Sequence, residues 1–267
     1  MPNSHALYIG GEWVAGAHAA QPNQNPSDLS DTIGHYDQAS AEQVKQAINA
    51  AQAGQKIWAE TGLEARYSVL MAIGNELIAR KDELGELLSR EEGKPLAEGK
   101  GEVYRSGQFF QYYAAEVLRQ IDDRVASVRP GVEIETRREP LGVVGVISPW
   151  NFPMATAVWK TAPALAFGNA VVFKPANLVP ASAWALTEII SRQNLPAGTF
   201  NLVTGSGREA GEALITSPHV QAITFTGSLE VGQRVASATA ANLVKCQLEM
   251  GSKNALIVLD DADLDLA

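Results

Sequence analysis

Apolar residues in the first 120 positions recur at the three- and four-residue spacings of amphipathic helices. Ser40 predicts the N-cap of a first helix that begins immediately after it. The spacing then predicts a single helix from Leu63 to about Glu92, which Gly93 and Pro95 would end. A further helix is predicted from about Ala97 to Ile121. This part of the chain is therefore expected to be mostly helical.

Two stretches near the N-terminus lack this pattern. Tyr8–Val14 alternates weakly around two consecutive glycines, which predicts a short β-hairpin. Residues 20–33 are rich in Pro, Asn, Ser and Asp, so we expect a loop there.

Beyond Pro130 the pattern becomes that of strands. Val132–Arg138 alternates apolar and charged residues, which predicts an antiparallel strand with one face in water. Short apolar runs then alternate with helical stretches, as in a parallel sheet covered by helices on both faces. We therefore expect an α/β fold with a Rossmann-like parallel sheet. The predicted strands are Val143–Ile147, Ala170–Phe173, Phe200–Val203, Ala222–Phe225, Val244–Leu248 and Ala255–Leu259.

The composition excludes several classes of protein. With 46% hydrophobic and 19% charged residues, the chain is typical of a globular protein. Its net charge of −9 argues against nonspecific binding to nucleic acid or to an anionic membrane surface. The sequence has no recognisable signal peptide, no run of about 20 apolar residues and no metal-ligand spacing. Because Cys246 is its only cysteine, no intrachain disulfide is possible, and we expect a cytoplasmic protein.

Polar and small residues follow five of the predicted strands. In a parallel sheet with helices on both faces, ligands bind beyond the carboxyl ends of the strands. Each of these segments alone is compatible with an ordinary strand-to-helix turn, but their joint occurrence indicates a binding site. The five ends carry Asn151, Lys174, Gly207, Gly227 with Ser228, and Glu249.

Three of these strand ends carry residues that could bind a nucleotide. Gly227 and Ser228 lie between a predicted strand and a helix, where backbone N–H groups would bind a phosphate. Lys174 would contact a ribose or a phosphate, unless it is a solvated surface lysine. The glycines at 205, 207 and 211 are spaced one residue too widely for the usual dinucleotide fingerprint, so they add weak support.

The other two ends carry candidate catalytic groups. The amide of Asn151 would stabilise an oxyanion, unless it caps its own turn. Glu249 ends an apolar strand and would act as a general base. Cys246 points to the opposite face of that strand, because side chains alternate. We therefore interpret Cys246 as a small buried hydrophobic residue and not as a nucleophile.

Five segments in order resemble motifs of the aldehyde dehydrogenase superfamily: Gly142–Pro153, Pro163–Asn169, Phe173–Pro175, Phe225–Ser228 and Leu248–Asn254. The resemblance extends over essentially the whole chain. It implies oxidation of an aldehyde to a carboxylate with NAD or NADP, in which a cysteine thiolate attacks the aldehyde. Asn151 would hold the oxyanion, and Glu249 would activate water. The implied cofactor contacts are Ile147, Ser148, Pro149, Trp150, Lys174, Ala176, Asn177, Gly207, Gly211, Phe225, Thr226, Gly227, Ser228, Val231, Met250 and Gly251.

The resemblance also implies a division of the chain. Residues 1–130 would form the N-terminal hairpin and helices of the cofactor domain, 131–142 part of an oligomerisation hairpin, and 143–259 the Rossmann-like core. Residues 260–267 read as the start of a helix and would begin a catalytic domain that carries the nucleophilic cysteine. The chain thus looks truncated and is expected to lack turnover alone. The full-length protein would be a homo-oligomer, either a dimer or a tetramer.

Substrate and cofactor preference are partly readable through the same resemblance. Asn177 stands where many NAD-preferring members carry Glu, so a 2′-phosphate would meet no repulsion and NADP is expected to be tolerated. Arg105 and Phe109 lie on a helix that would line the substrate entrance, together with Phe152 and Trp159. Unless Arg105 is a solvated surface residue, it would pair with a distal carboxylate, which favours an acidic semialdehyde such as α-ketoglutaric or succinic semialdehyde.

Two alternatives stay open. The polypeptide could be a nucleotide-binding module or an inactive fragment, since Cys246 does not match the position of the nucleophile. It could also resemble a CoA-acylating semialdehyde dehydrogenase, in which CoA takes the thioester. Glu249 argues against that second alternative, because transfer to CoA needs no carboxylate that activates water.

Overall fold

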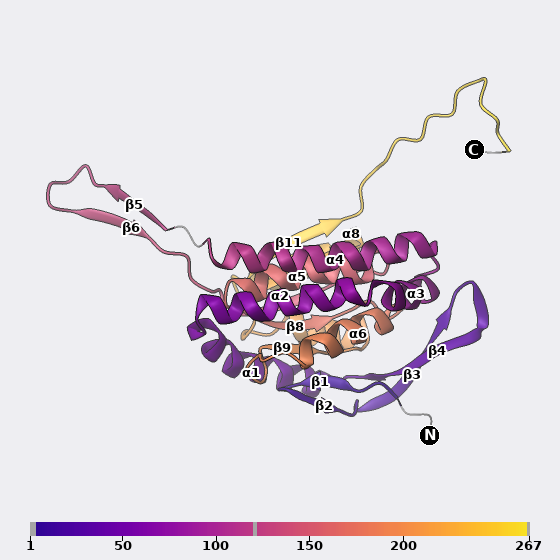
Figure 1. The fold of residues 1–267 in the computed structure, drawn as a ribbon, viewed down its shortest axis with the longest axis horizontal. Coiled ribbons are helices and arrows are strands. Elements are labelled where there is room, and N and C mark those ends of the chain that lie inside the picture. Colours follow the sequence, from indigo (N-terminus) through magenta and orange to yellow (C-terminus); the bar gives the residue numbers. More distant parts are fainter. Residues whose placement is uncertain (1–3, 120–121, 266–267) are drawn as a thin grey trace.

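The computed structural model describes residues 4–119 and 122–265, and a seven-stranded sheet lies at its centre (Figure 1). The strands follow the order β11-β10-β7-β8-β9-β1-β2. The first five are parallel, whereas β1 and β2 extend the sheet as an antiparallel edge. Their bounds are β1 Leu7–Ile9, β2 Glu12–Val14, β7 Val143–Ile147, β8 Ala170–Lys174, β9 Phe200–Leu202, β10 Ala222–Gly227 and β11 Lys245–Met250.

The winding of the sheet reverses between β7 and β10. The chain adds β8 and β9 on one side of β7 and then returns to add β10 and β11 on the other. In a doubly wound sheet, such a reversal opens a crevice at the carboxyl ends of the two central strands. Strands β7 and β8 are buried on both faces, which explains their continuous apolar sequences. The predicted α/β fold with a Rossmann-like sheet is confirmed.

Helices cover both faces of the sheet. On one face α5 and α6 pack against Val146 and Phe173, and α2, α3 and α4 pack over them as an outer layer (Figure 1). On the other face α1, α7 and α8 pack against Val172 and Ile223. The helices are α1 Ala41–Glu60, α2 Leu63–Ala79, α3 Lys81–Glu92, α4 Leu96–Val117, α5 Pro153–Ala166, α6 Pro180–Ser191, the π-helical turn η1 Gly207–Gly211, α7 Glu212–Ile215 and α8 Leu229–Ala241.

The first helices match the sequence pattern except at one corner. Ser40 caps α1 through a capping box with Gln43, as its position predicted. The single helix predicted from Leu63 to Glu92 is wrong, because the backbone leaves the helical conformation at Arg80 and forms α2 and α3. Arg80 pairs there with Glu76, Glu83 and Glu188, and the last of these contacts fixes the corner to α6.

The region predicted as a loop over residues 20–33 is a long two-stranded ribbon. Strands β3 His18–Asn25 and β4 Asp28–Gln38 pair antiparallel and curve along one side of the body (Figure 1). Only Asn23, Tyr36 and Asp37 are buried in this ribbon, and its other residues are exposed or half-buried, so its sequence needs no alternation of apolar and polar residues. The backbone ladder holds a polar segment in strand form, which explains why the prediction failed. The hairpin predicted over Tyr8–Val14 is present as β1 and β2.

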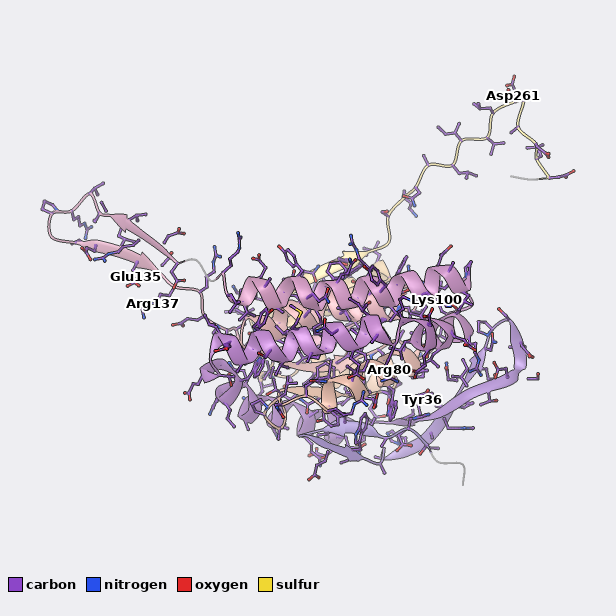
Figure 2. The ribbon with its side chains drawn as sticks, in the orientation of Figure 1. Tyr36, Arg80, Lys100, Glu135, Arg137 and Asp261 are labelled. Carbon is purple, nitrogen blue, oxygen red and sulfur yellow. The ribbon has the colours of Figure 1, made fainter. Side chains whose placement is uncertain are left out.

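A second ribbon projects from the body as an arm. Strands β5 Asp123–Ala126 and β6 Glu133–Thr136 pair antiparallel, which confirms the antiparallel strand predicted in this segment. Both faces of the arm are exposed, including Val125 and Ile134, so the expectation of a single face in water is wrong. The labelled side chains Glu135 and Arg137, an ion pair at 3.2 Å, lie well away from the helices (Figure 2). The predicted end of the preceding helix, Ile121, lies outside the described residues.

The C-terminal segment departs from two predictions. Residues Ala255–Leu259 form no strand, because no neighbouring backbone pairs with them, and their apolar side chains from Leu256 onward are exposed. Figure 1 shows this segment running away from the body. Residues 260–265 form turns and not the predicted beginning of a helix.

Cys246 also differs from its prediction. It is exposed and not buried, because β11 is the edge strand of the sheet and has β10 as its paired neighbour. In the described ranges, no helix combines the length and apolar composition needed to span a bilayer.

Candidate functional site

A cleft of about 1300 Å³ opens at the carboxyl ends of β7, β8, β10 and β11. It lies at the reversal between β7 and β10, where a doubly wound sheet places its ligand. Among the predicted site residues, those that line it are Ile147, Ser148, Pro149, Trp150, Asn151, Phe152, Trp159, Lys174, Ala176, Gly207, Gly211, Phe225, Thr226, Gly227, Ser228, Val231, Glu249, Met250 and Gly251. The predicted residues outside its lining are Arg105, Phe109 and Asn177.

Asn151 stands in the turn between β7 and α5. Its backbone carbonyl accepts a hydrogen bond from Lys94 Nζ at 2.9 Å, whereas its side chain forms no hydrogen bond with the described residues. The alternative in which the amide caps its own turn is therefore not supported. The amide is exposed at the wall of the cleft, where it is available as a donor to a developing negative charge.

Glu249 is held in place from two sides at the end of β11. Thr226 donates its hydroxyl to Oε2 at 3.0 Å, and the Gln247 amide donates to Oε1 at 2.7 Å. The ammonium of Lys160, which is buried on α5, lies 3.9 Å from Oε1. Burial lowers the pKa of Lys160 from its ordinary value, while the charge of Glu249 opposes this shift. The carboxylate is thus oriented at the cleft, with a buried cation beside one of its oxygens.

Lys174 is a buried residue and not a solvated surface lysine. Its side chain ends β8 with 5% of its surface exposed, and Nζ donates to the Pro175 carbonyl at 2.9 Å and to Asn177 Oδ1 at 3.4 Å. Burial lowers the pKa of its ammonium from 10.5 to about 8. A buried ammonium with few partners at a cleft wall can donate to a ligand oxygen.

The opposite wall is made of helix N-termini and glycines. Ser228 caps α8 by accepting from the Val231 N–H at 3.3 Å, so the amino end of this helix faces the cleft. A Cβ at Gly207 would meet open space, and the backbone there can approach a ligand closely. At Gly227 a Cβ would lie 2.6 Å from the ring of Phe225, so only glycine fits.

The aromatic residues predicted for the substrate gather at one end of the cleft. Trp159 and Phe152 line it, and the ring of Phe109 packs edge-on against Trp159 with centroids 6.3 Å apart. Arg105 is exposed on α4, donates to Gln108 at 3.1 Å and lies over the ring of Phe109. It shares a face of α4 with Phe109 but does not line the cleft.

Nine lining residues were not predicted: Thr156, Ser206, Arg208, Glu212, Ile215, Glu230, Arg234, Val235 and Ser252. Ser206 caps η1 and carries the one clear signal, because it stands between two glycines in the segment that follows β9. Most of the others lie on η1, α7 and α8. Arg234 pairs with Glu212 across these elements, a contact that no sequence pattern indicates.

The sequence model of the aldehyde dehydrogenase family matches residues 13–267. The chain belongs to the aldehyde dehydrogenase family. It is 42% identical over 267 residues to the α-ketoglutaric semialdehyde dehydrogenase of Bacillus subtilis, and the match covers 99% of this chain and 54% of that protein. The family resemblance of the sequence motifs is therefore confirmed.

Solved structures have the same fold, an aldehyde dehydrogenase among them. An NADP-dependent enzyme from E. coli superposes with a TM-score of 0.92 at 36% identity, over 98% of this chain and 55% of that one. Betaine aldehyde dehydrogenase from Staphylococcus aureus in complex with NAD+ superposes with a TM-score of 0.92 at 32% identity, over 98% and 53%. The chain thus spans about half the length of the relatives that it matches.

Proposed function

We propose that this chain is the cofactor-binding part of an enzyme that oxidises an aldehyde to a carboxylate with NAD or NADP. The observation that carries the proposal is the shared cleft, which is lined by Asn151, Glu249, Lys174 and the amino end of α8. A donor for an oxyanion, a carboxylate base and a phosphate-binding helix end are three of the groups that such a reaction requires, besides a nucleophile.

The lining of the cleft fits a dinucleotide. Ser148 Oγ is buried at the cleft wall and has no hydrogen-bond partner among the described residues. Lys174 and the N–H groups near Ser228 are further donors, and Gly207 and Gly251 leave open space above the backbone. We propose that Lys174 and Ser148 hold the ribose side and that the start of α8 faces the pyrophosphate. When bound, NAD(P)+ supplies the hydride acceptor.

The two catalytic candidates act at different stages. The Asn151 side chain donates N–H to the oxygen that becomes negative when a nucleophile adds to the aldehyde carbonyl. Glu249 removes a proton from the water that releases the acid, and Thr226 and Gln247 hold its carboxylate in place for this step. A base that activates water is superfluous for transfer to CoA, so Glu249 supports hydrolysis and not acylation of CoA.

A second candidate function, nucleotide binding without turnover, is favoured by the position of Cys246. This single thiol is on the edge strand and is not among the residues that line the cleft. We therefore propose that Cys246 is not the nucleophile and that the 267-residue chain binds cofactor without oxidising aldehydes. The predicted division into a cofactor core at 143–259 and an adjoining catalytic segment stays part of this proposal.

For the substrate we propose an acidic semialdehyde. The name of the Bacillus subtilis relative supports the α-ketoglutaric type. Arg105, close to Phe109 on α4, would attract the distal carboxylate of such an aldehyde as it approaches the aromatic end of the cleft.

We further propose that the complete enzyme is a homo-oligomer in the cytoplasm. The β5–β6 arm exposes Val125, Val132 and Ile134 away from the body, as an element that pairs with another subunit would. The exposed free thiol of Cys246 is compatible with a reducing compartment.

The experiment that tests the catalytic roles uses an enzyme of the relatives' full length that contains this chain. Asn151→Ala is expected to lower kcat by about 100-fold, because one oxyanion donor is lost. Glu249→Gln is expected to leave the first turnover of NAD(P)H formation intact and to abolish later turnovers, because release of the acid stops. Unchanged steady-state turnover in both variants would refute the proposal, and any oxidation by the 267-residue chain would refute the account of Cys246.

A further inference from the structure

One buried ion pair lies directly behind the turn that carries Asn151. Lys94 stands in the short link between α3 and α4, and Glu102 lies one and a half turns into α4. Their side chains are 7% and 2% exposed, and Lys94 Nζ lies 2.7 Å from Glu102 Oε2. A charge pair this deeply buried needs every further hydrogen bond that it can form, so its other contacts are informative.

Glu102 caps the helix that follows the turn. Its second oxygen, Oε1, accepts the backbone N–H groups of Met154 and Ala155, both at 3.0 Å. These N–H groups belong to the first turn of α5, where no carbonyl of the same helix can reach them. A negative charge is also favourable at this end of a helix. Glu102 therefore fixes the residues just beyond Asn151.

Lys94 holds the turn itself. Nζ donates to the carbonyl oxygen of Asn151 at 2.9 Å and lies 4.1 Å from the centre of the Phe152 ring. The carboxylate of Glu92 lies 2.9 Å away and adds a second negative charge to the site. The ion pair thus contacts residues 151–155 at both ends. Lys94 contacts Asn151 and Phe152, and Glu102 binds the start of α5.

A second helix on the same face of the sheet shows that a cap does not need such a lysine. Glu91, also buried, accepts from the backbone N–H groups of Ala181 and Ser182 and from the Ser182 hydroxyl, in the first turn of α6. No lysine or arginine of the described residues pairs with it, and burial raises its pKa to about 7. Helix capping alone therefore does not account for Lys94, whose additional contact is with Asn151.

We propose that Lys94 and Glu102 are positioning residues that set the place and direction of the Asn151 amide at the cleft. The inference rests on the proposed function of Asn151 as the oxyanion donor. Because a displacement of about 1 Å in a catalytic group lowers a rate by about 100-fold, a clamp on this turn has a direct effect on the reaction. The clamp also fixes Phe152, so it holds one wall of the aromatic end together with the amide.

The test reads the Asn151 side chain directly in the 267-residue chain. The ¹⁵N–¹H pair of its amide is assigned in NMR spectra by its loss in Asn151→Asp. In Lys94→Met and in Glu102→Gln the amide signals of Asn151 are expected to shift and broaden, because the turn loses its fixed position. Glu102→Gln keeps one oxygen for the α5 N–H groups, so it removes the charge of the pair with little change to the cap. Lys94→Arg restores a cation and is expected to return the signal close to its original position.

Glu91→Gln is the matched control, because it makes the same change in the cap of α6 and does not touch the turn. It is expected to leave the chemical shifts of the Asn151 amide unchanged. If the amide signals of Asn151 stay unchanged in Lys94→Met and Glu102→Gln, or shift equally in Glu91→Gln, the positioning role is wrong.

Turnover and cofactor affinity separate this inference from the proposed function. In an enzyme of full length, Lys94→Met is expected to lower kcat by about 10- to 100-fold and to leave the Kd of NAD(P)+ within about twofold. Equal losses in kcat and in cofactor affinity would indicate general damage and overturn the inference. If the wild-type chain binds no dinucleotide, the proposed function fails, whereas the NMR result still decides whether Lys94 and Glu102 position Asn151.

Discussion

The two ends of the cleft are built in different ways. At the cofactor end, Lys174 and Ser148 are 5% and 3% exposed and stand on the ends of central strands. At the aromatic end, Phe152 is 48% exposed, and the guanidinium of Arg105 has as its polar partner Gln108 on the same helix. The first end is fixed by the core of the sheet, whereas the second is formed by a turn and a helix surface. We therefore expect substitutions at the cofactor end to have larger effects.

The largest effect that we expect comes from the burial of Lys174. Because its pKa is lowered from 10.5 to about 8, the unfolded chain binds a proton between these pH values that the folded chain does not. Its contribution to folding stability is therefore complete above pH 10.5 and is lost as the pH falls through 8. Relative to Lys174→Met, the wild type is expected to gain about 2–3 kcal/mol in the free energy of unfolding from pH 7.5 to 10.

Urea unfolding followed by circular dichroism measures this gain. The exposed Lys245, at the opposite end of a strand in the same sheet, provides the control Lys245→Met. The free energy of unfolding of Lys245→Met should depend on pH in the same way as that of the wild type. If the free energies of unfolding of wild type and Lys174→Met change in parallel with pH, the two ends do not differ in burial as described.

An intermediate effect is expected at Asn177, on the rim of the cofactor end. Asn177→Glu places a carboxylate three residues after Lys174, where it would repel a 2′-phosphate. The affinity for NADP+ is expected to fall by about 10-fold, while the affinity for NAD+ stays equal or rises. Isothermal titration with both cofactors checks this, and Asn177→Gln serves as the neutral control. If NADP+ binds to Asn177→Glu as tightly as to the wild type, the assignment of Asn177 is wrong.

The smallest effect is expected at the aromatic end. In an enzyme of full length, Arg105→Ala should raise KM for an acidic semialdehyde by about two- to fivefold, because an exposed charge pair contributes little. KM for a neutral aldehyde of equal length should not change. Arg119→Ala, an exposed arginine just beyond the same helix, is the control. Equal increases for both aldehydes would reject a role in recognising a carboxylate.

The burial of the central strands also explains what could be predicted from the sequence. Strands β7 and β8 are buried on both faces, so their apolar runs are unmistakable, and the residues after them were predicted as ligand contacts. Arg208 and Arg234 were missed because they lie on η1 and α8. Their approach to the cleft depends on how these elements pack together, which no periodicity records.

Three errors in the fold have a common cause in the pairing of strands. The polar β3–β4 ribbon is held by its backbone ladder, so its composition resembles that of a loop. Residues Ala255–Leu259 have the composition of a strand but no neighbouring backbone. Cys246 has apolar residues on its own strand face, yet it is exposed because β11 is at the edge. In each case the sequence determines local preference, and the partner strand decides the outcome.

Titration of the 267-residue chain with NADP+ and NAD+ tests the central claim most directly. The account predicts that both cofactors bind at one site per chain and that Lys174→Met weakens binding by about 10- to 100-fold, since a hydrogen bond from a charged donor is lost. Lys245→Met should bind like the wild type. Absence of binding at millimolar cofactor, or equal affinity in Lys174→Met and the wild type, would contradict the assignment of this cleft as a dinucleotide site.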